Sequence, residues 1–453
     1  MAAFTDVDGV PMHAHRRLLR EVLKDEWGFE GVVVADWDGV GQLVNQGVAT
    51  DLRDAAAQAI AAGVDIDMVS GAYAAHLAEL VETGQVPLDL VDDAARRVIR
   101  LKMRHGLFEH PYVAVTPSAT VTTSASEPQP ASRILAREAA AASFVLLTNN
   151  GTLPLAPNPG RVLLTGPFAH EGEAFLGTSD RTMHLVLQAD VTVALVGEHP
   201  SRSGEANSVA SIGLPTGQLE VLRAMAAIGK PLVVVVFAGR PLDLGEVLGL
   251  ADAVLIAWHP GVEAGPALIE TLFGDRSPGG RLPMTFPRSL GHLPSSSLAR
   301  PTGRPIDAAN DARTGRYLDA LGVPRLPFGS GLTYTTFNYG PLRLSAREMP
   351  LHGGSIEVSV DVTNSGNRPG REVVQLYLRD VAAHVTRPLL ELADWVSLVL
   401  DAGAIGTASF TVTPAQLSYY DRTMTLRIDP GEAVVTVGPD AFSGASAWIT
   451  VTD

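Results

Sequence analysis

The sequence predicts a multi-domain protein in which two α/β regions precede an all-β region. A chain of 453 residues is too long to fold around a single hydrophobic core, so two or three domains are expected. Up to about residue 340, short apolar runs alternate with amphipathic helical segments, which is typical of α/β architecture. After Pro341 the helical periodicity stops and apolar residues recur at every second position, the pattern of half-buried strands.

Residues 1–110 predict a parallel α/β region. In chain order we expect a helix at Arg16–Trp27, a strand at Gly31–Asp36, a helix at Leu52–Ala62, a strand at Val64–Val69, and helices at Ala74–Thr83 and Leu88–His105. Short apolar strands that alternate with helices favour parallel pairing. Residues 111–130 are rich in Pro, Ser, Thr and Ala, lack periodicity and predict a linker.

Residues 131–340 predict a second α/β region with a mostly parallel sheet. We expect a helix at Ser132–Ala142 and strands at Phe144–Thr148, Arg161–Thr165, Val191–Val196, Leu232–Phe237 and Ala253–Ala257. Most of these strands are β-branched and soon followed by Gly or Pro, which suits strands buried on both faces. The stretch Pro294–Phe337 is irregular and rich in Pro and Gly, so it predicts a binding loop or a segment that wraps between domains.

Residues 341–453 predict a β-sandwich. Four runs alternate apolar and polar residues, at Ser355–Val362, Glu372–Leu378, Thr407–Val412 and Ala433–Val437. Turn residues separate these runs, and such spacing over roughly 110 residues is typical of two packed antiparallel sheets.

The composition excludes several classes of function. A formal net charge of −15, with no cluster of Lys or Arg, argues against nucleic acid and anionic membrane as partners and favours a neutral small molecule. The absence of cysteine excludes disulfides, thiolate metal sites and cysteine nucleophiles. The segment Met1–Gly9 has no basic stretch before an apolar one, and no run approaches a membrane span, which predicts a cytoplasmic location. No spacing matches a nucleotide-binding motif, so no cofactor is expected.

Asp36 is the first candidate for chemistry. It ends an apolar strand and precedes Trp37, and ligands of parallel α/β folds are met at the carboxyl ends of strands. A carboxylate there can attack a substrate, and an indole beside it can stack on a sugar face. The alternative interpretation, that Asp36 caps the following turn, stays open from position alone.

Glu198 and Glu205 are the other two carboxylates of interest. Both lie in a glycine-containing loop after the strand Val191–Val196, where a positioned general acid is expected. The alternative for each is a solvated loop charge. His199 beside Glu198 is a lone histidine followed by proline, so no metal is assigned.

Taken together, these segments resemble glycoside hydrolase family 3, which contains β-glucosidases and β-xylosidases. The resemblance is carried in order by Val34-Ala-Asp-Trp37, Ala62-Gly-Val-Asp-Ile-Asp-Met68, Arg100-Leu-Lys102, Ser203-Gly-Glu-Ala206, Gly239-Arg-Pro-Leu242, Arg281-Leu-Pro283, Val373-Val-Gln-Leu-Tyr-Leu378 and Thr386-Arg-Pro388. It implies a partial (β/α)8 barrel at 1–110, an α/β sandwich domain at 131–340 and a fibronectin type III-like β-sandwich at 341–453.

The same resemblance implies an exo-acting, retaining β-glycosidase that removes terminal β-linked sugars without a cofactor or a metal. Asp36 corresponds to the nucleophile and Glu205 to the acid/base, with Glu198 as the fallback. Trp37, Met1 and Phe4 correspond to substrate-binding residues. The two carboxylates of such a pair are expected about 5–5.5 Å apart.

The first region is much shorter than the barrel of the family. A complete barrel needs about 250 residues, whereas roughly 110 precede the linker here, so the chain is N-terminally truncated relative to the family. An incomplete parallel barrel exposes strand edges and apolar faces, which predicts a homo-oligomer or a partner chain that covers them. Two hypotheses follow. The chain is a β-glycosidase completed by further polypeptide, or it is a non-catalytic remnant that binds carbohydrate or protein.

Overall fold

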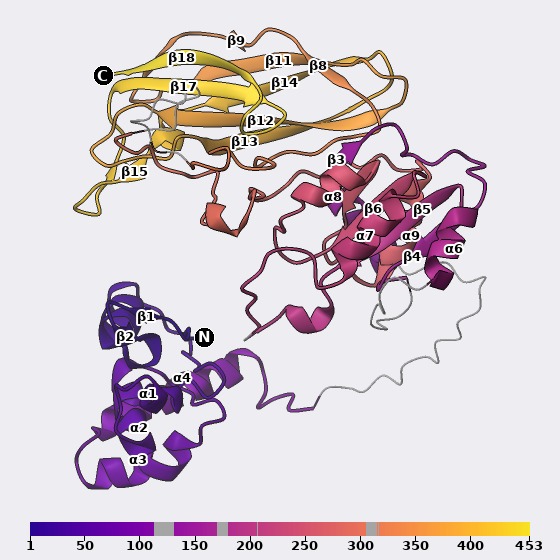
Figure 1. Ribbon diagram of the computed structural model, residues 1–453. Helices are drawn as coiled ribbons and strands as arrows, with labels where there is room; N and C mark the ends of the chain where they lie inside the picture. Colours follow the sequence, from indigo (N-terminus) through magenta and orange to yellow (C-terminus); the bar gives the residue numbers. More distant parts are fainter. Residues whose placement is uncertain (113–130, 170–179, 206, 305–314, 316) are drawn as a thin grey trace. The chain divides into compact units, whose positions relative to one another are not determined.

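The computed structural model describes residues 1–112, 131–169, 180–205, 207–304, 315 and 317–453 (Figure 1). The chain divides into two compact units, Met1–Ala125 and Ser126–Asp453, each described here by itself. The second and third predicted regions therefore belong to one unit. Most of the predicted linker at 111–130 lies outside the described residues.

Three extended segments form the centre of the first unit. The Ala2 N–H donates to the Val34 carbonyl at 2.9 Å, and the Ala35 N–H donates to the Ile66 carbonyl at 2.8 Å. Val34 and Ile66 form a single parallel bridge. The regular strands predicted at Gly31–Asp36 and Val64–Val69 are therefore wrong, although their parallel pairing is present.

A side chain explains why no longer ladder forms between these segments. The carboxylate of Asp65 accepts the backbone N–H of Val33 at 2.8 Å, a donor that would otherwise pair with a neighbouring strand. Asp65 and Ile66 both direct their N–H groups to the Val33 carbonyl, at 2.8 and 3.2 Å. This local pattern competes with regular sheet hydrogen bonding.

Helices surround the extended segments, and the predicted helices of this unit are confirmed with small shifts. They are η2 (Arg17–Glu26), α2 (Leu52–Ala62), α3 (Ala72–Glu82) and α4 (Leu88–Arg104), to which the structure adds β1 (Asp6–Val7), β2 (Val10–Pro11), η1 (Met12–Ala14) and α1 (Gln42–Asn45). η2 has π-helical hydrogen bonding, in which the Trp27 N–H donates to the Val22 carbonyl at 2.9 Å. α2 begins at the cap residue Asp51, whose carboxylate accepts the Asp54 N–H at 2.8 Å.

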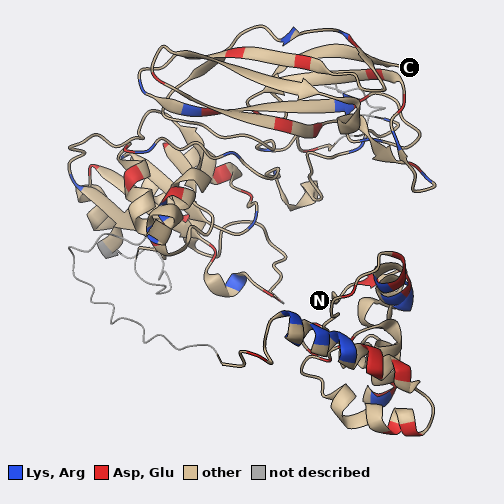
Figure 2. Ribbon diagram, turned by 180° about the vertical axis from the view of Figure 1, so that it is seen from behind, with Lys and Arg blue, Asp and Glu red and all other residues tan. Residues whose placement is uncertain are grey.

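Charge is segregated along α4. Its acidic residues lie toward the N-terminal end and its basic residues toward the C-terminal end, as Figure 2 shows, and this order complements the helix dipole. Arg97 also binds the start of the Asp36 segment, since its guanidinium donates to the carbonyls of Phe29 at 2.8 Å and Gly31 at 3.1 Å. α4 therefore fixes one end of that segment.

The α/β part of the second unit has a five-stranded sheet in the order β3-β7-β6-β5-β4. The strands are β3 (Val145–Asn149), β4 (Val162–Thr165), β5 (Val191–Gly197), β6 (Leu232–Phe237) and β7 (Ala253–Ile256). β3 is antiparallel to β7 and the other pairs are parallel, so the prediction of a mostly parallel sheet is confirmed.

Helices cover both faces of this sheet. α5 (Ala131–Ser143) and α9 (Ala264–Leu272) contribute to the apolar core on one face. α6 (Asp180–Gln188), α7 (Gln218–Ala226) and α8 (Gly245–Leu250) contribute to the core on the other. Short 3-10 turns lie at η3 (Pro200–Arg202), η4 (Gly261–Glu263) and η5 (Leu290–His292).

The C-terminal part is a β-sandwich. One sheet has the order β10 (Glu348–Pro350), β18 (Ala445–Thr452), β17 (Gly431–Gly438), β12 (Gly370–Asp380), β13 (Glu391–Leu400). The other contains β14 (Ile405–Val412), β11 (Ile356–Asn364), β8 (Phe337–Tyr339) and β9 (Arg343–Leu344), while β15 (Tyr419–Tyr420) and β16 (Leu426–Arg427) form a small ribbon after η6 (Pro414–Leu417). The four predicted strands are confirmed as β11, β12, β14 and β17.

A buried polar triad joins the two parts of the second unit. The Arg281 guanidinium lies 2.7 Å from the Glu372 carboxylate on β12, and the Tyr339 hydroxyl donates to the same carboxylate at 2.7 Å. Burial raises the pKa of Glu372 above its ordinary value, while the charge of Arg281 opposes that shift. The pair therefore stabilises the junction only while both charges are present.

None of the helices in the described ranges is long and apolar enough to span a bilayer. The cytoplasmic location stays a prediction.

We predict that Arg281→Ala destabilises the second unit by about 3–5 kcal/mol, because it leaves the Glu372 carboxylate buried without a cation. Arg343→Ala is the matched control, since it breaks the exposed Arg343–Asp361 pair and should cost at most about 1 kcal/mol. Urea unfolding of both variants measures the difference. Equal losses of stability in the two variants would contradict the role given to the junction.

Candidate active site

Asp36 lies at the end of the central extended segment of the first unit. Its side chain is half-buried, and one carboxylate oxygen accepts the Trp37 N–H at 2.7 Å. This contact with the first N–H of the following turn is the local contact expected of a turn cap, whereas α1 begins after Gly41 without a side-chain cap. Among the described residues Asp36 forms no ion pair, which leaves the second carboxylate oxygen available to a substrate.

His13 fixes the backbone of Asp36. Its imidazole is 1% exposed, and Nε2 accepts the Asp36 N–H at 3.2 Å. Burial lowers the pKa of His13 below 6.5, while the nearby charge of Asp36 acts in the opposite direction. A neutral imidazole is the form that accepts this hydrogen bond. Gly39 makes room for the ring, since a Cβ there would lie 2.2 Å from Nε2.

The predicted substrate-binding residues all belong to this unit. Phe4 lies beside His13, with ring centroids 6.1 Å apart, so Phe4, His13 and Asp36 form one contact chain. Trp37 is 65% exposed, which leaves its indole open to a ligand. Met1 is exposed, and the adjacent Ala2 pairs with the Asp36 segment. His13 was not predicted, because it precedes the first predicted helix, Arg16–Trp27, and no pattern of the sequence singles it out.

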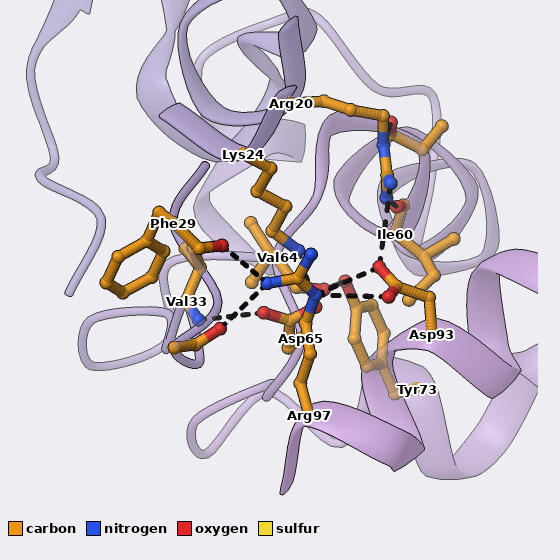
Figure 3. Close-up of polar contacts among 12 residues, drawn as sticks. Arg20, Lys24, Phe29, Val33, Ile60, Val64, Asp65, Tyr73, Asp93 and Arg97 are labelled. Atoms are coloured by element: carbon orange, nitrogen blue, oxygen red, sulfur yellow. Dashed lines mark hydrogen bonds and ion pairs between the residues drawn. The ribbon is translucent and has the colours of Figure 1, made fainter. Parts of the chain in front are cut away.

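A buried ion pair holds the two extended segments together (Figure 3). Lys24 Nζ lies 2.7 Å from Asp65 Oδ1, and both side chains are 1% exposed. Asp65 Oδ2 accepts the Val33 N–H in the segment that carries Asp36. Burial lowers the pKa of Lys24, and the hydrogen bond and charge of Asp65 oppose that shift. The pair therefore determines the register of the Asp36 segment.

Further arginine contacts surround this pair. Arg20 donates to the carbonyls of Ile60 at 3.2 Å and Ala61 at 3.1 Å, which ties η2 to the end of α2 (Figure 3). Asp93 accepts Arg97 Nε at 3.1 Å and lies 3.7 Å from Arg20. The positively charged side chains around Asp65 thus come from two helices, Arg20 and Lys24 from η2 and Arg97 from α4.

Two loops that each contain a left-handed residue follow the extended segments. Asp38 has φ 53°, which aspartate tolerates, whereas Val69 has φ 74°, which is costly for a β-branched residue. The Asp38 N–H donates to the Met68 carbonyl at 3.0 Å, so the two loops are tied to each other. Such strain is typical of functional sites.

In the second unit, Glu198 lies at the end of β5 and is fully paired. Its carboxylate lies 2.9 Å from Arg240 and 3.5 Å from Arg202, and its side chain is 0% exposed. Arg240 also donates to the Arg202 carbonyl at 2.8 Å. Glu198 therefore holds together the loops that follow β5 and β6, and it has no open face for a substrate.

Glu205 differs from Glu198 in both burial and pairing. Its side chain is exposed, and it follows Gly204, whose φ of 105° turns the loop outward from the paired core. Among the described residues Glu205 forms no hydrogen bond or ion pair. Of these two glutamates, Glu205 is the one whose side chain is exposed and has no partner among the described residues.

The described residues include no group of His, Asp and Glu arranged to hold a metal ion. His199 Nδ1 instead accepts the Ser201 N–H at 3.2 Å and lies 2.8 Å from the Ser201 hydroxyl. This histidine organises its own loop.

Three family models match the chain. The glycosyl hydrolase family 3 N terminal domain matches residues 1–101, the glycosyl hydrolase family 3 C-terminal domain matches 176–334, and a fibronectin type III-like domain matches 372–441. These matches confirm the predicted fold class.

Curated relatives and solved structures agree with these matches. A periplasmic beta-glucosidase of Salmonella typhimurium is 33% identical over 97% of this chain and 66% of its own length. A beta-xylosidase of Formosa agariphila is 30% identical over 100% of this chain and 69% of its own. The structure of a beta-glucosidase from Listeria innocua in complex with glucose is 33% identical, with a TM-score of 0.90, over 100% of this chain and 67% of that one. The chain thus spans about two thirds of the length of these relatives.

We predict that Lys24→Met destabilises the first unit by about 3–5 kcal/mol, because it leaves the Asp65 carboxylate buried and unpaired. The double variant Lys24→Met/Asp65→Asn should recover part of this loss, since no buried charge remains and the amide oxygen still accepts the Val33 N–H. Chemical unfolding measures both, with Arg104→Ala of the exposed Arg104–Glu30 pair as the control. A double variant no more stable than Lys24→Met would refute the assignment.

The lowered pKa of His13 predicts a pH dependence of stability. The unfolded chain binds a proton at the ordinary value of 6.5 and the folded chain only at lower pH, so the His13 contribution is present above 6.5 and lost as the pH falls below it. His13→Gln keeps an acceptor for the Asp36 N–H without titrating. Unfolding free energies at pH 7.5 and about 5.5 should therefore differ more for the parent chain than for the variant. Equal differences would argue against a buried neutral His13.

Proposed function

The chain belongs to glycoside hydrolase family 3, and we propose that it supplies the catalytic carboxylates of a retaining β-glycosidase that removes terminal β-linked sugars. The main support for this proposal is the Asp36 carboxylate, which forms no ion pair among the described residues. It follows a backbone segment held by His13 and by the Lys24–Asp65 pair. A nucleophile needs a free oxygen on a fixed backbone. Asp36 meets both requirements.

In the proposed reaction, Asp36 attacks the anomeric carbon and the bond to the leaving oxygen breaks as that oxygen takes a proton from the acid/base carboxyl, which becomes a carboxylate. This gives a covalent glycosyl ester on Asp36. Water then attacks the same carbon, loses its proton to the acid/base and releases Asp36 and the free sugar. Trp37 offers an exposed indole as a stacking surface beside the nucleophile.

We assign the acid/base role to Glu205. Its exposed side chain has no partner among the described residues, whereas Glu198 is held by two arginines. A carboxylate that must donate a proton and later accept one needs access to both the leaving group and water. Of these two glutamates, Glu205 is the one with that access within its own unit.

The non-catalytic alternative is less well supported. The relatives named above are a beta-glucosidase and a beta-xylosidase, and the matched segments include both proposed carboxylates. We accordingly propose that the substrate is a β-glucoside or a β-xyloside.

We further propose that additional polypeptide covers the first unit. Large apolar side chains are exposed on it, among them Trp27, Met103, Phe108 and Tyr112. Exposed apolar surface of this kind marks a protein contact. A partner chain or a second copy would bury it, and added parallel segments would also satisfy the edges beside Ala2 and Ile66.

We predict that Asp36→Asn lowers hydrolysis of aryl β-glucosides and β-xylosides by about 10³-fold or more, because it removes the nucleophile. The purified chain and this variant are compared under the same conditions. If both give the same background rate, this polypeptide alone is not a glycosidase.

We predict that Glu205→Gln separates substrates by leaving group. A poor leaving group needs its proton and should lose about 10²–10⁴-fold in rate, whereas a dinitrophenyl glycoside should still form the ester and accumulate it. Added azide should then release a β-glycosyl azide. Glu198→Gln is the comparison, and rescue by azide in that variant instead would transfer the acid/base role to Glu198.

A further inference from the structure

A groove of about 830 Å³ lies within the second unit, between its α/β part and the sandwich. Its floor is the outer face of the sandwich sheet, where β12 and β13 present three cross-strand pairs. These are Arg371 opposite Val399, Val373 opposite Ser397 and Gln375 opposite Trp395. The walls come from α5 and from the loop Arg276–Pro283. The floor of the groove is therefore formed by side chains on the face of the sheet, and not by the backbone of the edge strand β13.

Trp395 is the principal apolar feature of this floor. It is 58% exposed, and Val399 on the same strand is 70% exposed. A tryptophan left open in a groove offers a flat apolar surface that is normally buried against a ligand. Gln375 holds this corner rigid, because its amide donates to the Gly329 carbonyl at 3.1 Å and its oxygen accepts the Tyr377 hydroxyl at 2.5 Å.

Four charged residues line the groove, of which Arg276 and Arg281 are paired with Glu270 and Glu372. The other two are Glu138 on α5 and Arg371 on β12, and neither side chain has a hydrogen bond or ion pair among the described residues. The stem of Arg371 lies beside Gly279, where an added Cβ would be 3.4 Å from Cδ of the arginine. The Nε atom of Arg281 and the hydroxyl of Ser397, which also lines the groove, are buried without a partner.

This combination identifies the chemistry of the ligand. A carboxylate acceptor and a guanidinium donor favour a neutral molecule with many hydroxyl groups over either an anion or a cation. The exposed indole favours a ligand that also has flat C–H faces. A polypeptide strand would instead pair with the edge of β13, which is not the surface that the groove presents.

We propose that this groove binds a neutral β-linked oligosaccharide, with Trp395 as the stacking surface and with Glu138 and Arg371 as hydrogen-bonding partners. The site belongs to the sandwich junction and includes neither Asp36 nor Glu205. It does not depend on the proposed catalytic activity.

The test is calorimetric titration of the full chain with cellotetraose and with laminaritetraose, in the Asp36→Asn background so that no ligand is hydrolysed. Trp395→Ala should weaken binding at the groove by about tenfold or more, with an unchanged unfolding midpoint. Trp448→Ala is the matched control. Trp448 is exposed on β18 of the same sheet but does not line the groove, so its removal should leave the affinity unchanged.

Arg371→Ala provides a second variant, because its side chain is exposed and its loss should weaken binding without unfolding the sheet. If the catalytic site also binds the probe, Trp395→Ala should reduce the stoichiometry from two to one. The proposal is overturned if neither oligosaccharide binds or if Trp395→Ala binds as Trp448→Ala does. It is also overturned if the parent chain self-associates through this face, with the association lost in Trp395→Ala and no oligosaccharide bound.

Discussion

The Lys24–Asp65 pair is the interaction on which the arrangement of the first unit depends. Two opposite charges, each 1% exposed, lie 2.7 Å apart at the point where η2 meets two extended segments. Asp65 has two tasks, since one oxygen pairs with Lys24 and the other accepts the Val33 N–H. The segment that ends at Asp36 is consequently held by side chains as well as by a sheet. This explains how a single parallel bridge suffices to present a carboxylate in a defined position.

The second unit also contains a buried cluster of opposite charges, but there the buried carboxylate belongs to the loop that carries a candidate catalytic residue. Glu198 is buried between Arg240 and Arg202, and this cluster fixes the loops that follow two neighbouring parallel strands. Beyond the cluster the chain turns at Gly204 and exposes Glu205. One glutamate of the loop is therefore structural and the other is open to solvent.

Periodicity alone was sufficient to predict much of the fold. The limits of α2 and β6 agree residue for residue with the predicted segments, because their apolar patterns are long and end at clear signals. The first-unit strands were wrong because the ladder is interrupted by the side chain of Asp65, which apolarity cannot indicate. β13 was missed because its alternation is broken near Asp394, where the pairing with β12 skips a residue.

The candidate site was predictable only in part. Asp36 and the loop of Glu205 stand out by their positions after apolar runs. Position did not separate Glu205 from Glu198, and only the family resemblance ranked Glu205 first. The difference lies in Arg240, which is distant in sequence and 2.9 Å away in space. His13 was missed for the same reason, since its role comes from a contact with the Asp36 backbone.

The central claim is that Asp36 forms a covalent bond to the sugar. Incubation of the chain with a 2-deoxy-2-fluoro-β-glucosyl fluoride, which slows release of the ester, followed by mass spectrometry of the peptides, tests it most directly. The account predicts one added fluoroglucosyl group on the peptide that contains Asp36. A label on another carboxylate, or an unlabelled folded chain, would contradict it.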